Sequence, residues 1–237
     1  MIDRLRTTKP SVTNAVVLGF DPDLDTTGWC LIIASIHKPA LGHPPIQEVH
    51  IGLIESGPAA KGLIDLEKTE VMVWATTMWP PENLMVGAYS MSARSAATQN
   101  VHKDSMGALA THHCFVEAQR IYPNKDETPK ERVGKGNDLI HLAQVTGALQ
   151  AAGHRLGYGV QAVLPQTWKG QGSKGSTVAL LQERFASVPI HVHVATGYMD
   201  VTAAKLDRLP GKMGHALDAA GIALYGLDYL AVHGASL

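Results

Sequence analysis

Four residues of this sequence have the types and positions that metal-assisted chemistry needs: Asp21, Glu117, His215 and Asp218. Asp21 ends the apolar run that begins at Val16, and Glu117 lies toward the end of a second apolar run that begins at Cys114. Such runs are typical of strands buried on both faces. An acid at the end of a buried strand is costly unless a partner compensates its charge, and a metal ion is the simplest partner.

The other two residues belong to a predicted helix near the end of the chain, over residues 213–232. His215 and Asp218 are three positions apart and therefore share one face of this helix. The small residues that follow would let the helix approach a sheet closely: Ala219, Ala220, Gly221 and Ala223. A sheet carrying two acids and a helix carrying a histidine and an acid could thus meet at one place.

The segment after Asp21 is rich in Asp, Thr and Gly, which predicts a tight turn with Asp23 and Asp25 as turn residues. The chain would then reverse into a second strand over residues 29–34 and a third over 49–55. Three successive strands indicate an antiparallel meander. The remaining elements are expected in this order: a helix over 65–79, an unassigned stretch over 80–104, a strand over 114–119, a charged loop over 122–132, a helix over 137–152, a strand over 160–164, a basic loop over 165–175, a helix over 176–185, a short edge strand over 191–194 and a connector over 205–212.

Composition sets broad limits. The chain has 237 residues, of which 45% are hydrophobic, enough for one packed domain over residues 15–237 behind a flexible tail over 1–14. The formal charge of −1 gives no global sign of a polyanionic partner, so a nucleic-acid surface would have to be local. Cys30 and Cys114 fall in predicted buried strands and suit reduced thiols. We expect a cytoplasmic protein with no membrane segment.

The order of these elements is similar to that of the ribonuclease H-like fold. Within it, the motifs resemble those of the RuvC-type Holliday junction resolvases. The first strand of that family is close to LGIDPGxxxTG, against LGFDPDLDTTG at residues 18–28 here, and its LGQxxG helix motif is followed with one change by LAQVTG at 142–147. Glu117 matches the second acid of the family, and His215 with Asp218 matches its closing helix. Asp23 departs from the family, which has glycine there.

The resemblance implies an α/β fold with a mixed five-stranded sheet, an antiparallel three-strand meander and flanking helices. It also implies a homodimeric, metal-dependent endonuclease that resolves four-way DNA junctions by paired symmetric nicks. Two Mg²⁺ ions about 4 Å apart, replaceable by Mn²⁺, would serve the hydrolysis. Asp21 would bridge both ions, Glu117 would hold one, and Asp218 with His215 would hold the other. His215 is open to two roles, metal ligand or acceptor of the proton of the attacking water.

Four residues are expected to contact DNA: Lys169, Lys174, Arg120 and Tyr122. The two lysines correspond to basic residues that the family uses near the scissile phosphate, and their glycine-rich segment suits phosphate contact. Arg120 stands where the family has an aromatic residue, so stacking on a DNA base would fall to Tyr122 or be replaced by charge.

Other interpretations remain open at this stage. The substrate could be a flapped, RNA-containing or other branched nucleic acid, because selectivity resides in loops. A sugar kinase or actin-like ATPase also has Asp followed by Thr-Thr-Gly in its first hairpin, and a non-catalytic junction-binding protein is a further possibility. Asp21 could simply cap its turn, Glu117 could be an ordinary strand-end acid, and His215 with Asp218 could form a solvated helix face. Two histidine pairs have no cysteine or acid arranged beside them for a zinc site and are interpreted as structural or exposed: His112 with His113, and His191 with His193.

Overall fold

A computed structural model describes residues 13–24, 26–36, 42–55, 110–118, 129–155, 158–170, 174–194 and 197–233. Several sequence-based expectations lie outside these residues. They are residues 1–12 of the predicted tail, Asp25, the helix over 65–79, the unassigned stretch over 80–104, and the DNA-contact candidates Arg120 and Tyr122. The last two residues of the predicted tail, Thr13 and Asn14, instead begin the first strand.

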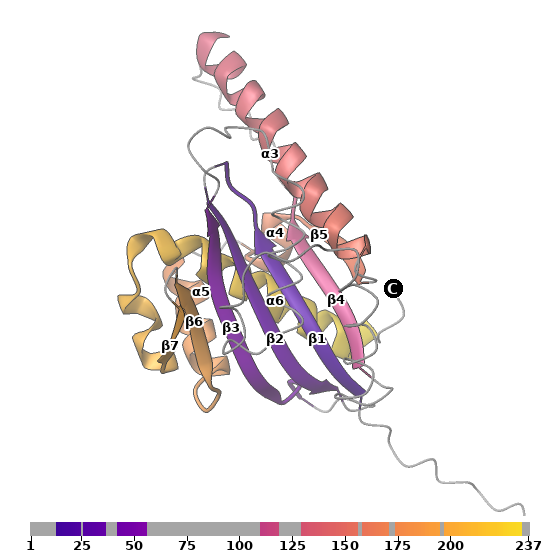
Figure 1. Ribbon diagram of the computed structural model, residues 1–237, viewed down its shortest axis with the longest axis vertical. Helices are drawn as coiled ribbons and strands as arrows, with labels where there is room; N and C mark the ends of the chain where they lie inside the picture. The colour runs from indigo at the N-terminus through magenta and orange to yellow at the C-terminus, as the bar shows by residue number, and fades with distance from the viewer. Residues whose placement is uncertain are drawn as a thin grey trace, which may run out of the picture.

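The described residues form one seven-stranded mixed sheet in the order β5-β4-β1-β2-β3-β6-β7 (Figure 1). Its strands are β1 (Thr13–Asp21), β2 (Thr26–Ile36), β3 (Ile46–Glu55), β4 (Ala110–Glu117), β5 (Gly159–Val163), β6 (Ile190–Val194) and β7 (Gly197–Val201). β1, β2 and β3 pair antiparallel, which confirms the predicted meander. β4 pairs parallel with β1, and β5 pairs parallel with β4. The order β5-β4-β1-β2-β3 with these directions is that of the ribonuclease H-like fold.

The sheet is wider than the five strands expected. β6 pairs parallel with β3, and β7 pairs antiparallel with β6, so the predicted edge strand near residue 191 is followed by a further strand that forms the outer edge. β7 was missed because its central residues Tyr198, Met199 and Asp200 are all exposed and show no apolar alternation.

The helices cover the two faces of the sheet. They are α3 (Pro129–Arg155), α4 (Pro165–Trp168), α5 (Lys174–Arg184) and α6 (Gly214–His233). Two short 3-10 turns, η2 (Ala203–Arg208) and η3 (Gly211–Met213), lie between β7 and α6. α3 and α4 begin inside segments predicted as loops. Each starts with proline, which is favoured at the first helical position because it has no N–H to satisfy there.

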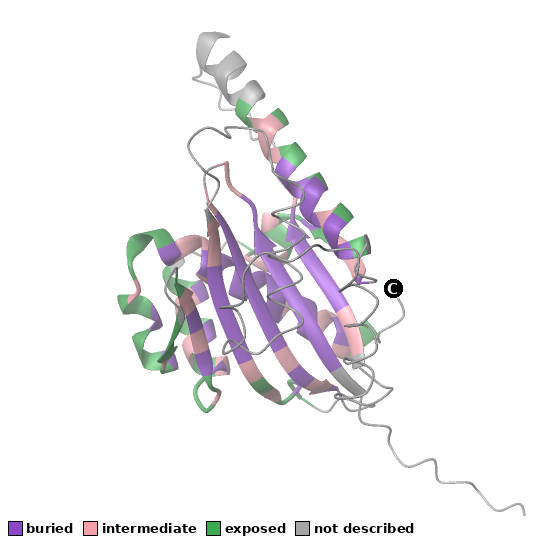
Figure 2. Ribbon diagram, viewed as in Figure 1, coloured by how far each residue is buried: buried purple, intermediate pink, exposed green. Residues whose placement is uncertain are grey.

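Two apolar clusters lie on opposite faces of the sheet because strand side chains alternate. Val16, Leu18 and Phe20 of β1 pack with Val145 and Leu149 of α3. The intervening residues of β1 point to the other cluster, which includes most of the apolar residues of α6. Figure 2 accordingly shows the central strands as buried along most of their length. In the part of the chain that the structure describes, no helix is long and apolar enough to cross a membrane.

α6 lies very close to the sheet, as its small residues predicted. A Cβ atom on Gly19 of β1 would lie 2.4 Å from the carbonyl oxygen of Ala219, and one on Gly28 of β2 would lie 2.0 Å from that of His215. Because both contacts are to helix backbone, neither can be relieved by a change of side-chain rotamer. Gly28 therefore sets where α6 begins relative to the end of β1.

Candidate metal-dependent active site

Asp21 is the last residue of β1, an interior strand of the sheet, and is 7% exposed. Burial raises the pKa of its carboxyl group above the ordinary value. A hydrogen bond from His215 opposes that rise, and the negative charges of Asp218 and Asp23 add to it. The carboxylate is thus held in a site where it lacks enough positive charge to offset its loss of water.

Glu117 is the last residue of β4, which runs parallel to β1 with Val116 beside Phe20, so both acids reach the same edge of the sheet. Its Oε2 accepts a 2.8 Å hydrogen bond from Nε1 of Trp168. Burial, and secondarily the charge of Asp21, raise the pKa of Glu117 to about 7, although the Trp168 hydrogen bond lowers it. Near neutral pH this carboxyl group therefore exists in both protonation states.

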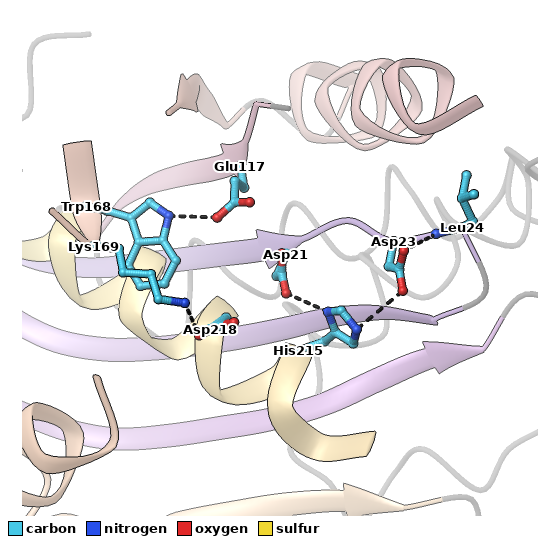
Figure 3. A network of polar contacts seen from close by, with 8 residues as sticks. All are labelled: Asp21, Asp23, Leu24, Glu117, Trp168, Lys169, His215 and Asp218. Carbon is cyan, nitrogen blue, oxygen red and sulfur yellow. Dashed lines mark hydrogen bonds and ion pairs between the residues drawn. The ribbon is translucent and has the colours of Figure 1, made fainter. Parts of the chain in front are cut away.

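The first turns of α6 bring His215 and Asp218 to the same edge (Figure 3). His215 Nδ1 lies 2.7 Å from Oδ2 of Asp21, and its Nε2 lies 3.3 Å from Oδ2 of Asp23. The imidazole thus lies between two carboxylates. Asp218 is 9% exposed, and its charge is felt at both Asp21 and Glu117.

A lysine reaches this group of acids from the segment after β5. Val163, the last residue of β5, pairs with Glu117. α4 follows β5 and therefore begins at the same edge of the sheet, and Lys169 comes directly after α4. Lys169 Nζ lies 3.1 Å from Oδ1 of Asp218, and Figure 3 shows its chain passing alongside Trp168 toward that acid. The segment predicted as a flexible basic loop is therefore partly helical, and it delivers one of the two predicted lysines.

All four residues singled out first from the sequence thus lie at one edge of the sheet. Two further residues of the site, Asp23 and Trp168, were not predicted to take part in it. Asp23 is a turn residue, as predicted, and its Oδ1 accepts a hydrogen bond from the N–H of Leu24. Its other carboxylate oxygen, Oδ2, faces His215. Of the remaining DNA-contact candidates, Lys174 is the first residue of α5, and its side chain lies outside the described part of the structure.

The donor set suits a hard divalent cation. Asp21, Glu117 and Asp218 offer carboxylate oxygens, the ligands that Mg²⁺ prefers, and the raised pKa values of the first two show that the site favours added positive charge. No three acid or histidine ligand atoms of this site lie within 4.8 Å of one another; among the described residues only Glu48, His50 and His191 meet that spacing.

That last group corrects the sequence interpretation of two histidines. His191 does have acids beside it: its Nε2 lies 3.0 Å from Oε1 of Glu48, and its Nδ1 lies 2.7 Å from Oδ1 of Asp200. His193 lies against His50, with 3.1 Å between their ring nitrogens. These contacts were missed because they join strands far apart in the sequence.

The other histidine pair agrees with the structural interpretation. His113 is 3% exposed within β4, and burial lowers its pKa, which keeps the ring neutral. His112 stacks edge-on against Tyr158, with ring centroids 5.3 Å apart. Cys30 and Cys114 are buried free thiols, as expected.

Comparisons with known proteins give matches only among solved structures. No family model matches the chain, and no curated protein matches it. The structure is similar to that of Thermus thermophilus RuvC, with 16% sequence identity and a TM-score of 0.47, over 90% of this chain and 94% of the other. It is also similar to T. thermophilus RuvC in complex with a Holliday junction substrate, with 14% identity and a TM-score of 0.48, over 94% and 97% of the two chains.

Proposed function

We propose that this chain is a metal-dependent endonuclease that resolves four-way DNA junctions. The observation that carries the proposal is the meeting of Asp21, Glu117 and Asp218 at one edge of the sheet from β1, β4 and α6. Burial keeps two of these acids short of compensating charge. A structural role alone gives no reason to gather three acids there, because buried like charges oppose folding.

Asp21, Glu117 and Asp218 would hold the ions, and Mg²⁺ is the ion that their oxygen atoms favour, with Mn²⁺ as a substitute. Bound there, two such ions would activate a water molecule and neutralise the charge that develops on the attacking and leaving oxygens of a phosphodiester. Asp21 is the residue suited to contact both ions, because its charge raises the pKa of Glu117 and the charge of Asp218 raises its own.

His215 is the proposed proton acceptor. If Nδ1 of the neutral ring donates its proton in a hydrogen bond to Asp21, Nε2 keeps the lone pair that would take a proton from water, and the Asp23 carboxylate beside Nε2 would stabilise the imidazolium that results. The side chain is 35% exposed, which gives water access to the ring. This arrangement favours proton transfer over the alternative role of metal ligand.

Lys169 is the proposed phosphate contact within the site. Its ammonium group lies beside Asp218 with 21% of the side chain exposed, so it can neutralise a phosphate that approaches the acids. Lys174, Arg120 and Tyr122 remain proposed DNA contacts on the strength of the sequence resemblance. The four-way junction as substrate, the homodimer and the paired symmetric nicks have the same support.

A panel of end-labelled substrates at one salt concentration tests the substrate class. We expect a four-way junction to be cut in Mg²⁺ by paired nicks at symmetric positions, and a three-way junction, a flap, an RNA–DNA hybrid and linear duplex to be cut far more slowly. Equal cutting of the flap or hybrid would assign the chain to another branch-selective nuclease of this fold. A junction that is bound but not cut in any divalent ion would show a non-catalytic binding protein.

A further inference from the structure

A second group of metal-ligand side chains lies away from the proposed active site, where β6 joins the edge of the core sheet. His50 of β3 and His191 of β6 are direct cross-strand neighbours, and their rings stack with centroids 4.7 Å apart. Glu48 is two residues before His50 and so projects from the same face of β3. Val49 and Ile51, between and beyond them, point into the core on the α6 side, so the group occupies the opposite face.

The ligand atoms of this group converge on one point. Oε1 of Glu48 lies 3.1 Å from Nε2 of His50 and 3.0 Å from Nε2 of His191. All three ligand atoms lie within 4.8 Å of one another. Ligand atoms bound to one Zn²⁺ ion at about 2.0–2.1 Å would be separated by distances of this size.

Each histidine of the group also has a partner for its other ring nitrogen. Nδ1 of His191 lies 2.7 Å from Oδ1 of Asp200 on β7, and Nδ1 of His50 lies 3.1 Å from Nε2 of His193 on β6. Metal-binding histidines in proteins are usually held in this way, by a carboxylate or another acceptor that fixes the ring and its tautomer. In the tautomer in which each ring donates from Nδ1, its Nε2 presents a lone pair toward Glu48.

The charges of the group also favour a bound cation. When a neutral His191 keeps its proton on Nδ1 and donates it in a hydrogen bond to Asp200, its Nε2 presents a lone pair to the Glu48 carboxylate, and two acceptors then face each other at 3.0 Å. A cation between them turns this repulsion into coordination. His50 is 6% exposed, so this ligand of the group is shielded from water.

We propose that Glu48, His50 and His191 form a zinc site, separate from the nuclease centre, that fastens the β6–β7 hairpin to β3. Two imidazoles and one carboxylate form a set that Zn²⁺ binds and that Mg²⁺, which requires oxygen ligands, does not. Glu48 is exposed over 37% of its side chain, so a water molecule can complete the fourth position.

The position of the site explains what it would do. β6 pairs with β3 through only three residues, Val49 to Ile51 opposite Ile190 to Val192. A metal ion bound by both strands would reinforce this short junction and hold the two added strands on the sheet. The site is distinct from the nuclease centre. Asp21 pairs with Gly28 of β2, which pairs with Leu53 near the end of β3, whereas Glu48 lies near the start of β3.

Zinc binding to the Asp21→Asn chain tests the proposal without a contribution from an intact nuclease centre. The chain is titrated with Zn²⁺ against a chromophoric chelator in excess Mg²⁺, and thermal unfolding is followed in parallel. We expect one Zn²⁺ per chain and a higher unfolding temperature. Glu48→Gln and His191→Ala should each weaken zinc binding at least about tenfold, and Asp200→Asn by roughly 10–100-fold, because it orients a ligand.

His154→Ala, on an exposed position of α3, is the matched control and should bind Zn²⁺ like the parent. Co²⁺ added in place of Zn²⁺ should give the visible absorption of a tetrahedral ion in the parent and the control, and not in Glu48→Gln. If His191→Ala fails to fold by circular dichroism, the isosteric Glu48→Gln change decides. Absence of zinc binding by the parent, or equal binding by the parent and Glu48→Gln, would overturn the proposal and leave an ion-pair network.

Discussion

Replacing Glu117 by glutamine is expected to stabilise the metal-free chain at pH 8 while abolishing its cleavage activity. Burial raises the pKa of this carboxyl group from 4.5 to about 7, so its ionised form is unfavourable in the folded chain. At about 1.4 kcal/mol for each pH unit, this difference corresponds to roughly 3 kcal/mol of lost stability once the group is ionised. Glutamine carries no charge and its side-chain oxygen can still accept the hydrogen bond of Trp168.

The effect of Glu117→Gln on the free energy of unfolding should depend on pH. Because the folded chain binds the Glu117 proton more tightly than the unfolded chain, the stability of the parent should fall as the pH rises from 4.5 to about 7 and then level off. The stabilising effect of Glu117→Gln should therefore be near zero at pH 4.5 and should reach about 2–3 kcal/mol at pH 8.

Urea unfolding in EDTA at the two pH values measures this effect. Glu183→Gln, at an exposed position of α5, is the control and should change stability by less than about 0.5 kcal/mol at either pH. In Mg²⁺ the parent should gain stability and Glu117→Gln should gain much less, because one carboxylate ligand is lost. A Glu117→Gln chain that is no more stable than the parent at pH 8 in EDTA would refute the claim that this acid is held under electrostatic strain.

Three further predictions follow from the site. Gly28→Ala should destabilise the chain by at least about 1–3 kcal/mol in urea unfolding, because the added methyl group meets helix backbone. The control Gly147→Ala, whose methyl group meets nothing within 4 Å, should be neutral or stabilising. Equal changes in the free energy of unfolding for the two variants would contradict the close approach of α6. Lys169→Ala should weaken junction binding in Ca²⁺ and reduce the slope of log affinity against log salt by about 1, and an unchanged slope would exclude a phosphate contact. Trp168→Phe removes a hydrogen bond that lowers the pKa of Glu117, so the acidic limb of the pH–cleavage profile should move to higher pH; an unmoved limb would mean that Glu117 does not set it.

Much of the candidate site could be predicted from the sequence, because its elements are local. An apolar run that ends in an acid predicts a buried strand with a carboxylate at its edge, and this holds for both Asp21 and Glu117. The His215 and Asp218 pair follows in the same way from helical spacing. Local patterns did not predict that α6 packs at the same edge as the two acids, although the small residues of that helix indicated a close approach to the sheet.

The missed contacts depend on register between segments distant in the sequence. Asp23 has the composition of a turn residue, and only the position of α6 brings His215 to it. His50 and His191 are separated by 141 positions and become neighbours because β6 pairs with β3, a pairing that no local pattern specifies. β7 was missed for a related reason, since an exposed edge strand lacks the apolar alternation that marks a half-buried one.

Cleavage of a synthetic four-way junction by the parent and by Asp21→Asn most directly tests the central claim, that the acids of β1, β4 and α6 form a metal-dependent nuclease centre. Asp138→Asn, at an exposed position of α3, serves as the matched control. We predict that the parent and the control cut the junction in Mg²⁺ and not in EDTA, and that Asp21→Asn binds the junction in Ca²⁺ with unchanged affinity but does not cut it in Mg²⁺. Equal cutting by the parent and Asp21→Asn, or cutting that persists in EDTA, would contradict the account.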